Sequence, residues 1–532
     1  MNSTDFDRAV GRLLRAGDFR RLVALCRAMR AENPLYADAW FLESVAAEVG
    51  GNLGAALKLV DRALEIDHAN PEYLTQKARY HSSANQDAEA GNAADMAVSV
   101  GVRSPQSMNT LGVVYTRLGR HENALKLLTQ AAGLKPADPD VIFNLAASMQ
   151  FMGRHDDARK NYERVTQLQP DNARSYWALS ELEKVDVSDR YESAMRTLAQ
   201  RPGLSDRDEL YLAHALSRIE ESRGEYSSAL RRLRAAKTRR RESLEYEFDQ
   251  DAALFNAVIE SFTTVQPTKN ADASSVPLQT PLFVVGLPRT GTTLVEQILT
   301  AHSKVASLGE LQDLPSAVKR LSGDTGCKII SPEVIESTAR GEIPLERAYI
   351  HSIAPRLKNI PPGTSYFIDK TPLNVFMLGY VMRFMPRAKV ILLRRDPMDT
   401  VLSNYRQLFS TDYSYYNYSY DLEDTACYVA AFEALVDHWK TVLGKRMLVI
   451  DYELLVGDSE SYSRAMFDYL GLDWEPGCLR FFENKRAVAT PSAPQVRTPV
   501  YSSAVGRWRK YGSIIEPAKH KLAELGITRT AS

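Results

Sequence analysis

The chain has 532 residues, enough for about two to four domains. Its 66 lysines and arginines balance 66 aspartates and glutamates, so the overall charge does not indicate a nucleic-acid or anionic-membrane partner. No apolar run approaches the ~18 residues of a membrane span, and residues 1–7 do not resemble a signal peptide. The cysteines lack C-x-x-C spacing, which excludes the usual zinc and disulfide patterns: Cys26, Cys327, Cys427 and Cys478. We therefore predict a cytoplasmic protein without a membrane span.

The first half of the chain repeats with a period of 34 residues. Three kinds of residue keep this spacing: turn residues (Gly17, Gly51, Asn85, Gly119 and Gly153), small residues (Ala56, Ala90, Ala124 and Ala158) and prolines (Pro71, Pro105 and Pro139). This combination is typical of tetratricopeptide (TPR) repeats, in which alanine lets paired helices approach and proline ends a unit. We predict an all-α TPR superhelix over residues 1–245.

Other polar features of this half are interpreted as surface features. His121 and His155 fall at repeat turns, so we expect solvated loop side chains. The basic run 237–241 precedes several glutamates, which favours an exposed helix end over a nucleic-acid site. Residues 266–280 are polar and lack periodicity, so we assign 246–280 to a connecting helix and linker.

From residue 281 on, short apolar runs alternate with helical stretches. The expected strands are 281–285, 305–307, 365–368, 389–393 and 447–450. This alternation predicts an α/β domain over residues 281–532, with a mostly parallel sheet that helices cover on both faces. Ligands of such sheets bind at the carboxyl ends of the strands.

The first of these strands leads into a loop with the spacing Gly286-x-x-x-x-Gly291. A strand, a tight loop and a helix start together make an anion cradle of backbone N–H groups. The spacing is that of a Walker A loop, but Thr292 stands where the phosphate-binding lysine is expected. The sequence therefore predicts a P-loop-like site for a phosphate-bearing ligand other than ordinary ATP. A plain strand-to-helix turn would explain the glycine but not Arg-Thr-Gly-Thr-Thr together.

Polar motifs follow the later strands as well. Residues 282–511 contain, in order, Pro-Arg-Thr-Gly-Thr-Thr, Gly-Glu, Asp-Lys-Thr-Pro, Arg-Asp-Pro with a later serine, Tyr-Glu, Gln-Val-Arg and Val-Gly-Arg-Trp-Arg-Lys-Tyr. This series resembles the sulfotransferases that use 3′-phosphoadenosine 5′-phosphosulfate (PAPS). It is most similar to the bacterial TPR-containing sulfotransferases related to tyrosylprotein sulfotransferases.

The resemblance implies a binding site for PAPS. The 5′-phosphosulfate loop would be Arg289, Thr290, Gly291, Thr292 and Thr293, and the 3′-phosphate site Arg395 and Ser403. Tyr452 would lie beside the nucleotide, and Arg497 would close over it. Without the resemblance, Arg395 could pair with Asp396 or Asp399, Tyr452 could be a core aromatic, and Arg497 could be a rim charge.

The resemblance also implies the catalytic residues. Glu310 would be the general base, Lys370 and Arg289 would stabilise the leaving phosphate oxygen, and Ser492 would lie near the reacting centre. Alternatives are a helix-capping role for Glu310 and an ion pair between Lys370 and Asp369. No metal is implied, because lysine and arginine carry the charge that Mg²⁺ carries in kinases.

The acceptor is predicted to be a tyrosine hydroxyl of a peptide or protein held in the TPR groove. A small phenol or a carbohydrate is the alternative acceptor, and a homodimer is an alternative to a monomer. Two other functions remain open: a phosphotransferase, with Asp369 and Asp451 as its only Mg²⁺ candidates, and a TPR scaffold with an inert domain. The tyrosine-rich residues 412–421 are either an acceptor-side lid or a half-buried strand.

Overall fold

A computed structural model of the chain describes residues 3–182, 189–268, 279–324, 326, 328–411, 414–483, 500 and 502–528. Its contacts divide the chain into two compact units, Met1–Leu168 and Gln169–Ser532. The domain limits at residues 245 and 280 remain predictions, and this division by contacts falls earlier in the chain.

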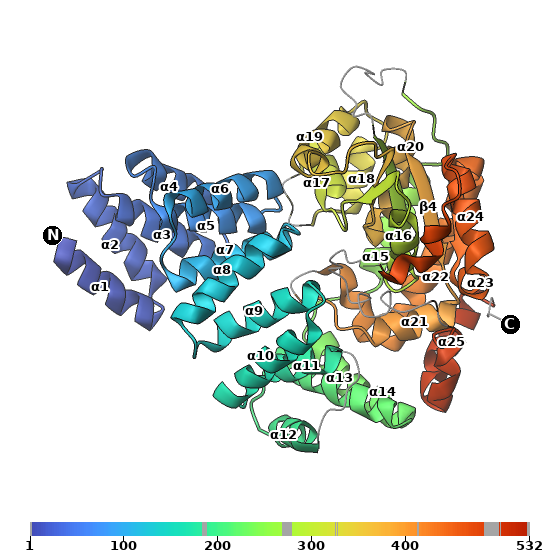
Figure 1. The fold of residues 1–532 in the computed structure, drawn as a ribbon, viewed down its shortest axis with the longest axis horizontal. Helices are drawn as coiled ribbons and strands as arrows, with labels where there is room; N and C mark the ends of the chain where they lie inside the picture. Colours follow the sequence, from blue (N-terminus) through green and yellow to red (C-terminus); the bar gives the residue numbers. More distant parts are fainter. Residues whose placement is uncertain are drawn as a thin grey trace. The chain divides into compact units, whose positions relative to one another are not determined.

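The first unit consists of helices that pack in pairs along the chain (Figure 1). The turn residues of the 34-residue period all have positive φ, between 56° and 77°, a conformation that glycine and asparagine tolerate best. The period alanines are fully buried, so paired helices approach closely. The predicted TPR architecture is confirmed. The helices are α1 (Ser3–Ala16), α2 (Phe19–Glu32), α3 (Ala37–Val49), α4 (Leu53–Ile66), α5 (Pro71–Ser83), α6 (Asp87–Val100), α7 (Pro105–Arg117), α8 (His121–Leu134), α9 (Pro139–Phe151) and α10 (His155–Leu168).

The repeat prolines are the first residues of α5, α7 and α9, where a missing N–H is tolerated. Asn70, just before α5, accepts backbone hydrogen bonds from Glu72 at 3.0 Å and Tyr73 at 3.3 Å. The prediction for the two histidines is wrong. His121 and His155 begin α8 and α10, and His121 is buried, which lowers its pKa.

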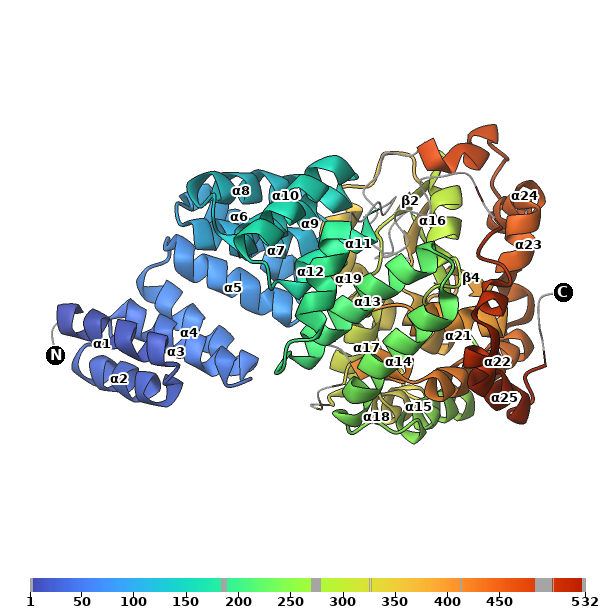
Figure 2. The ribbon, with the colours of Figure 1, turned by 90° about the horizontal axis from the view of Figure 1, so that it is seen from below.

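The second unit begins with further helices: α11 (Ala173–Glu181), α12 (Asp189–Ala199), α13 (Asp206–Ser222), α14 (Tyr226–Glu242) and α15 (Asp249–Ser261). We predicted that the basic run in α14 is an exposed helix end, and this prediction is wrong for two of its residues. Lys237 is fully buried and donates to the Ser419 carbonyl at 2.8 Å, and Arg241 pairs with Asp424 at 2.7 Å. Figure 2 shows α13 and α14 against the part of this unit that carries α21 and α22. Leu230 and Leu233 of α14 belong to its core.

A five-stranded parallel sheet lies at the centre of this unit. The strands are β1 (Thr280–Gly286), β2 (Val305–Ser307), β3 (Tyr366–Asp369), β4 (Lys389–Arg394) and β5 (Met447–Asp451), in the order β2-β3-β1-β4-β5. Side chains of β1 alternate between two cores: Leu282 and Val284 face one, and Phe283 and Val285 face the other. The predicted α/β class and the parallel sheet are confirmed.

Helices on both faces bury these cores, and a parallel arrangement brings all five carboxyl ends to one edge. None of the described helices combines the length and the apolar character needed to cross a membrane.

The tyrosine-rich segment forms the short helix η2, with Tyr418 and Tyr420 buried, so the alternative of a strand is wrong. The remaining elements are α16 (Thr292–Thr300), α17 (Asp313–Ser322), α18 (Pro332–Thr338), α19 (Leu345–Leu357), η1 (Pro372–Met377), α20 (Leu378–Phe384), α21 (Pro397–Tyr405), η2 (Ser414–Tyr420), α22 (Leu422–Leu443), η3 (Gly444–Arg446), α23 (Tyr452–Gly457), α24 (Ser459–Leu470), η4 (Pro476–Glu483), η6 (Arg507–Ile515) and α25 (Glu516–Glu524).

Candidate functional site

The loop after β1 turns back tightly before α16 begins. Arg289 has φ +69° and Gly291 has φ +104°, so Thr290 has a residue with positive φ on each side. The Thr290 hydroxyl donates to the Leu287 carbonyl at 2.8 Å and closes the turn. Helix α16 starts at Thr292, so its free N–H groups and positive dipole end lie at the loop. This is the backbone arrangement of an anion cradle.

The two loop glycines are required by close neighbours. A Cβ on Gly286 would lie 2.8 Å from the Leu393 carbonyl oxygen of β4, and a Cβ on Gly291 would lie 2.6 Å from the Tyr452 ring. The loop therefore packs directly on β4 and on the residue that follows β5. Tyr452 is thus placed against the cradle by contact, not only by its position in the sequence.

Arg395 follows β4 and bridges the loop to the C-terminal region. It donates to the Arg289 carbonyl at 3.0 Å and to the Ala504 carbonyl at 2.5 Å, and its guanidinium lies 4.8 Å from the centroid of the Tyr452 ring. The predicted alternative was an ion pair of Arg395 with Asp396 or Asp399. The Asp399 Oδ2 lies 3.9 Å from Nη2 of Arg395, which is long for an ion pair. The Arg395 Nε is buried without a hydrogen-bond partner. A buried, unsatisfied guanidinium N–H fits an anionic ligand.

These residues line one pocket, which encloses about 870 Å³ including its solvent-open part. Among the described residues, four guanidinium groups converge on it from separate segments of the chain, and Asp399 is the one lining carboxylate. Such a concentration of fixed positive charge favours a ligand with more than one anionic group. The lining residues are Arg289, Gly291, Thr293, Leu294, Arg395, Asp399, Leu402, Ser403, Arg406, Tyr452, Val456, Phe481, Val500, Ser503, Ala504 and Arg507.

Glu310 and Lys370, at the ends of β2 and β3, form an ion pair with 2.5 Å between Oε1 and Nζ. The Lys370 side chain is only 1% exposed, whereas that of Glu310 is 45% exposed. Burial disfavours the ammonium, but the carboxylates of Glu310 and Glu296 outweigh it and raise the pKa of Lys370. The lysine is therefore charged at neutral pH, and the glutamate is open to an incoming molecule.

Backbone hydrogen bonds fix this pair in place. The Lys370 N–H donates to the Gly309 carbonyl at 2.9 Å, and the Thr371 hydroxyl bonds both backbone groups of Leu311. The predicted alternatives were a helix-capping role for Glu310 and an ion pair between Lys370 and Asp369. The N-cap of α17 is Gln312, and the hydrogen-bonded carboxylate partner of Lys370 is Glu310.

Asp369 is fully buried beside Lys370 and accepts hydrogen bonds from the Tyr349 hydroxyl at 2.9 Å and the Thr371 N–H at 3.2 Å. Burial raises its pKa to about 7, although both hydrogen bonds oppose the shift. A carboxyl group that holds its proton near neutral pH and lies inside the core is poorly suited to bind Mg²⁺. One of the two phosphotransferase candidates is thereby weakened.

The predicted site residues that the structure describes fall into three sets. Six line the pocket: Arg289, Gly291, Thr293, Arg395, Ser403 and Tyr452. Thr290 and Thr292 are buried in the loop itself, and the Glu310–Lys370 pair lies at the neighbouring strand ends without lining the pocket. Ser492 and Arg497 lie outside the described residues. Sequence reasoning missed Arg406 and Arg507 as pocket residues. Their signals were weak: Arg406 stands three residues after Ser403, and Arg507 belongs to the Val-Gly-Arg-Trp motif.

Comparison with known proteins agrees with both halves of this description. Residues 281–476 match the model of the sulfotransferase family, and residues 8–71 and 115–182 match tetratricopeptide repeat models. The segment that matches the sulfotransferase family thus follows the segments that match TPR repeats. These matches do not identify an acceptor.

Several relatives match this chain at modest identity. An uncharacterized protein of Aquifex aeolicus is 27% identical over 75% of this chain and 52% of its own length. A protein-tyrosine sulfotransferase of Drosophila melanogaster is 27% identical over 43% of this chain and 46% of its own length. The chain therefore spans about half the length of these two relatives. The solved structure of the TPR protein YrrB covers 36% of this chain and 97% of its own, with 19% identity and a TM-score of 0.30.

Proposed function

We propose that the protein is a PAPS-dependent sulfotransferase. The observation that carries the proposal is the arginine-rich pocket at a P-loop-like turn in which Thr292 replaces the Walker lysine. A ligand with anionic groups at both the 5′ and 3′ positions of its ribose would use both the cradle and the Arg395–Ser403 side of this pocket. The family of the domain supports the same ligand.

In the proposed reaction, the Glu310 carboxylate accepts the proton of an acceptor hydroxyl. The hydroxyl oxygen then bonds to the sulfur as the bond from sulfur to the bridging phosphate oxygen breaks. Lys370 and Arg289 stabilise the negative charge that grows on that oxygen. The products are a sulfate ester and adenosine 3′,5′-bisphosphate. Ser492 is proposed near the reacting centre and Arg497 over the nucleotide.

The ion pair between Glu310 and Lys370 supports these roles. The contact places the Lys370 ammonium directly beside the Glu310 carboxylate, so the proposed base and the group that would stabilise the leaving oxygen lie at one point. When the acceptor proton neutralises Glu310, the pair weakens, and Lys370 becomes available to the leaving oxygen. The two steps of the reaction would then be coupled through one contact.

We propose a tyrosine hydroxyl of a peptide or protein as the acceptor. Two observations support it: the similarity to protein-tyrosine sulfotransferases, and the TPR unit, whose stacked helix pairs are of the kind that binds peptides. A phenol or a sugar hydroxyl remains the alternative acceptor. Incubation with radiolabelled PAPS and host lysate, followed by identification of the labelled residue, separates them.

Calorimetry with adenosine 3′,5′-bisphosphate tests the nucleotide assignment. We expect binding without Mg²⁺ that is at least tenfold tighter than the binding of ATP. Arg395→Ala should weaken it by about 1.5–3 kcal/mol, the scale of a hydrogen bond to a charged group. Arg395→Lys should fall between, because it keeps the charge and loses the planar fork. Equal affinity for ATP, or a requirement for Mg²⁺, would favour a phosphotransferase instead.

A further inference from the structure

One carboxylate of α13 contacts two arginines of the pocket. Glu221 lies in the last turn of α13, and its side chain is 6% exposed. Its oxygens accept hydrogen bonds from the Arg406 guanidinium on both sides of the fork, and Oε2 accepts one from Arg507 at 3.1 Å. The Tyr511 hydroxyl donates to Oε1 at 2.5 Å. Glu221 thus joins α13, α21 and η6 at one point.

Both arginines also line the pocket. Arg406 follows Ser403 by three residues, so the two residues lie on one face at the end of α21. A guanidinium has five N–H donors, and the carboxylate occupies only part of them. The remaining donors of Arg406 and Arg507 are therefore those that a bound anion can use.

The cluster keeps its charges at neutral pH. Burial opposes the ionised form of Glu221, but Arg406 and Arg507 outweigh it, so the pKa of Glu221 is lowered. Burial likewise opposes the charge of Arg406, but Glu221 more than offsets it and raises the pKa of Arg406. A charged carboxylate between two charged guanidinium groups holds both of them by strong, directional hydrogen bonds.

Helix α14 holds this arrangement from the other side. Tyr226 packs on Tyr511 with 5.3 Å between ring centroids, and the Ser227 hydroxyl donates to the Tyr511 carbonyl at 3.3 Å. The buried Lys237 amino group donates to the backbone carbonyls of Ser419 and Gln407, the latter just after α21. Consequently, hydrogen bonds and ring packing connect the α13–α14 pair to the segments that carry Arg406 and Arg507.

We propose that Glu221 is a positioning residue, which holds Arg406 and Arg507 in the orientation that binds the 3′-phosphate of the nucleotide. The inference rests on the proposed function, because Ser403 beside Arg406 is assigned there to the 3′-phosphate. Two long side chains that are already ordered lose less rotamer freedom when the phosphate binds, which strengthens binding. The helices after the TPR unit would in this way contribute to nucleotide selectivity.

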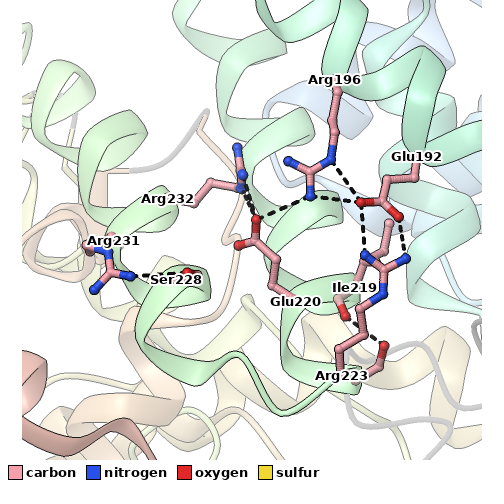
Figure 3. A network of polar contacts seen from close by, with 9 residues as sticks. Glu192, Arg196, Ile219, Glu220, Arg223, Ser228, Arg231 and Arg232 are labelled. Carbon is pink, nitrogen blue, oxygen red and sulfur yellow. Dashed lines mark hydrogen bonds and ion pairs between the residues drawn. The ribbon is translucent and has the colours of Figure 1, made fainter.

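The neighbouring residue provides a matched control. Glu220 is also buried in α13 and also pairs with arginines, but its partners are Arg232 at 2.5 Å and Arg196 at 3.7 Å, neither of which lines the pocket (Figure 3). Glu220→Gln and Glu221→Gln remove one buried charge from the same helix turn. Any difference between them in nucleotide binding reports on the pocket arginines and not on loss of a buried ion pair.

The test compares two ligands, adenosine 3′,5′-bisphosphate and adenosine 5′-monophosphate, which lacks the 3′-phosphate. Titration calorimetry of the full chain gives the first affinity, and displacement gives the second. We expect Glu221→Gln to weaken the bisphosphate about tenfold and the monophosphate less than twofold, the scale of one charge-assisted hydrogen bond. Glu220→Gln should change neither ligand by more than about twofold.

Three outcomes would overturn the inference: unchanged bisphosphate affinity in Glu221→Gln, tighter binding, or equal losses for both ligands. If Glu221→Gln does not fold, Tyr511→Phe replaces it, because this variant removes only one hydrogen bond to the carboxylate. A Tyr511→Phe protein with the wild-type ratio of the two affinities then overturns the inference. Failure of the wild-type protein to bind the bisphosphate would instead refute the proposed function.

Discussion

The proposed role of Glu310 as the general base can be tested directly by mutation. Glu310→Gln should lower the rate of sulfate transfer by ~10² or more, because an amide cannot accept the acceptor proton. Nucleotide affinity should stay within about twofold, since Glu310 does not line the pocket. The transfer of label from PAPS to the acceptor and calorimetry with the bisphosphate product measure the two effects.

Glu342→Gln is the matched control for this variant. Glu342 is an exposed glutamate that pairs with Arg383 at 3.0 Å and does not line the pocket. We expect its transfer rate to equal that of the wild type. A Glu310→Gln protein with near-normal transfer would mean that another group is the base.

Asp369 gives a pH dependence with a definite sign. Its pKa rises from 3.8 to about 7 on folding, mainly because of burial. Between these values the unfolded chain has lost the proton and the folded chain still holds it, so stability falls as pH rises, by at most about 1.4 kcal/mol per pH unit. The loss is complete above the folded pKa. Asp369→Asn should therefore flatten the decline of Tm between about pH 4 and pH 7.

Thermal unfolding across that interval checks this prediction. Asp437→Asn, at a side chain that is 67% exposed, serves as the control and should follow the wild-type profile. A variant that keeps the full wild-type slope would show that Asp369 ionises normally in the folded protein.

At the level of single residues, the sequence predicted those side chains that follow strands directly. Arg395 and Lys370 come immediately after β4 and β3, so the parallel sheet alone brings them to one edge. Glu221 could not be predicted in this way, because its contact with Arg406 depends on how α13 packs 185 residues away in the sequence. Lys237 was predicted to be exposed, although it follows the buried Leu233 by four residues and so falls on the apolar face of α14.

The β1–α16 loop leads to a prediction at the level of elements. Gly291→Ala and Gly323→Ala both place an L-residue at positive φ, which costs roughly 1–2 kcal/mol. Only at Gly291 does the added Cβ also strike a neighbour, the Tyr452 ring at 2.6 Å, whereas Gly323 has open space. Gly291→Ala should therefore weaken binding of the bisphosphate product more than tenfold, and Gly323→Ala should only lower Tm.

Calorimetry of both variants, with Tm measured in parallel, checks this comparison. Equal affinities in the two variants would mean that the loop does not form the binding site.

The elements themselves were largely predictable. The observed strands begin and end within about two residues of the predicted ones, because buried parallel strands have uninterrupted apolar sequences. The 34-residue period identified the TPR turns for an equally simple reason, since each unit requires a left-handed residue at the same place. The short helix η2 was missed because alternating tyrosines, serines and asparagines carry no clear period.

For the whole molecule, the division at residue 168 decides where a truncation can be made. A protein of residues 169–532 keeps α13 and α14, and should bind adenosine 3′,5′-bisphosphate within about twofold of the full chain. Residues 246–532 lack both helices, which removes Glu221 and Lys237 and leaves their partners buried and unpaired. This shorter protein should bind the product at least tenfold more weakly or fail to fold.

Calorimetry and thermal unfolding of the two truncated proteins test this prediction. Transfer to the natural acceptor gives a separate result. If residues 169–532 modify it at the full-length rate, the TPR unit does not deliver the substrate. Tight product binding by residues 246–532 would instead show that α13 and α14 are dispensable for the pocket.

Helix α13 has two kinds of neighbour, and this has a consequence for how such chains can evolve. On one side it packs on α11 and α12, and on the other its Glu221 contacts Arg406 and Arg507. In a repeat array each unit contacts only its neighbours. We therefore expect that 34-residue units can be duplicated or deleted ahead of α11, whereas α13 and α14 are inherited together with the sheet. The length of the array could then vary in evolution while the contacts of Glu221 with Arg406 and Arg507 stay the same.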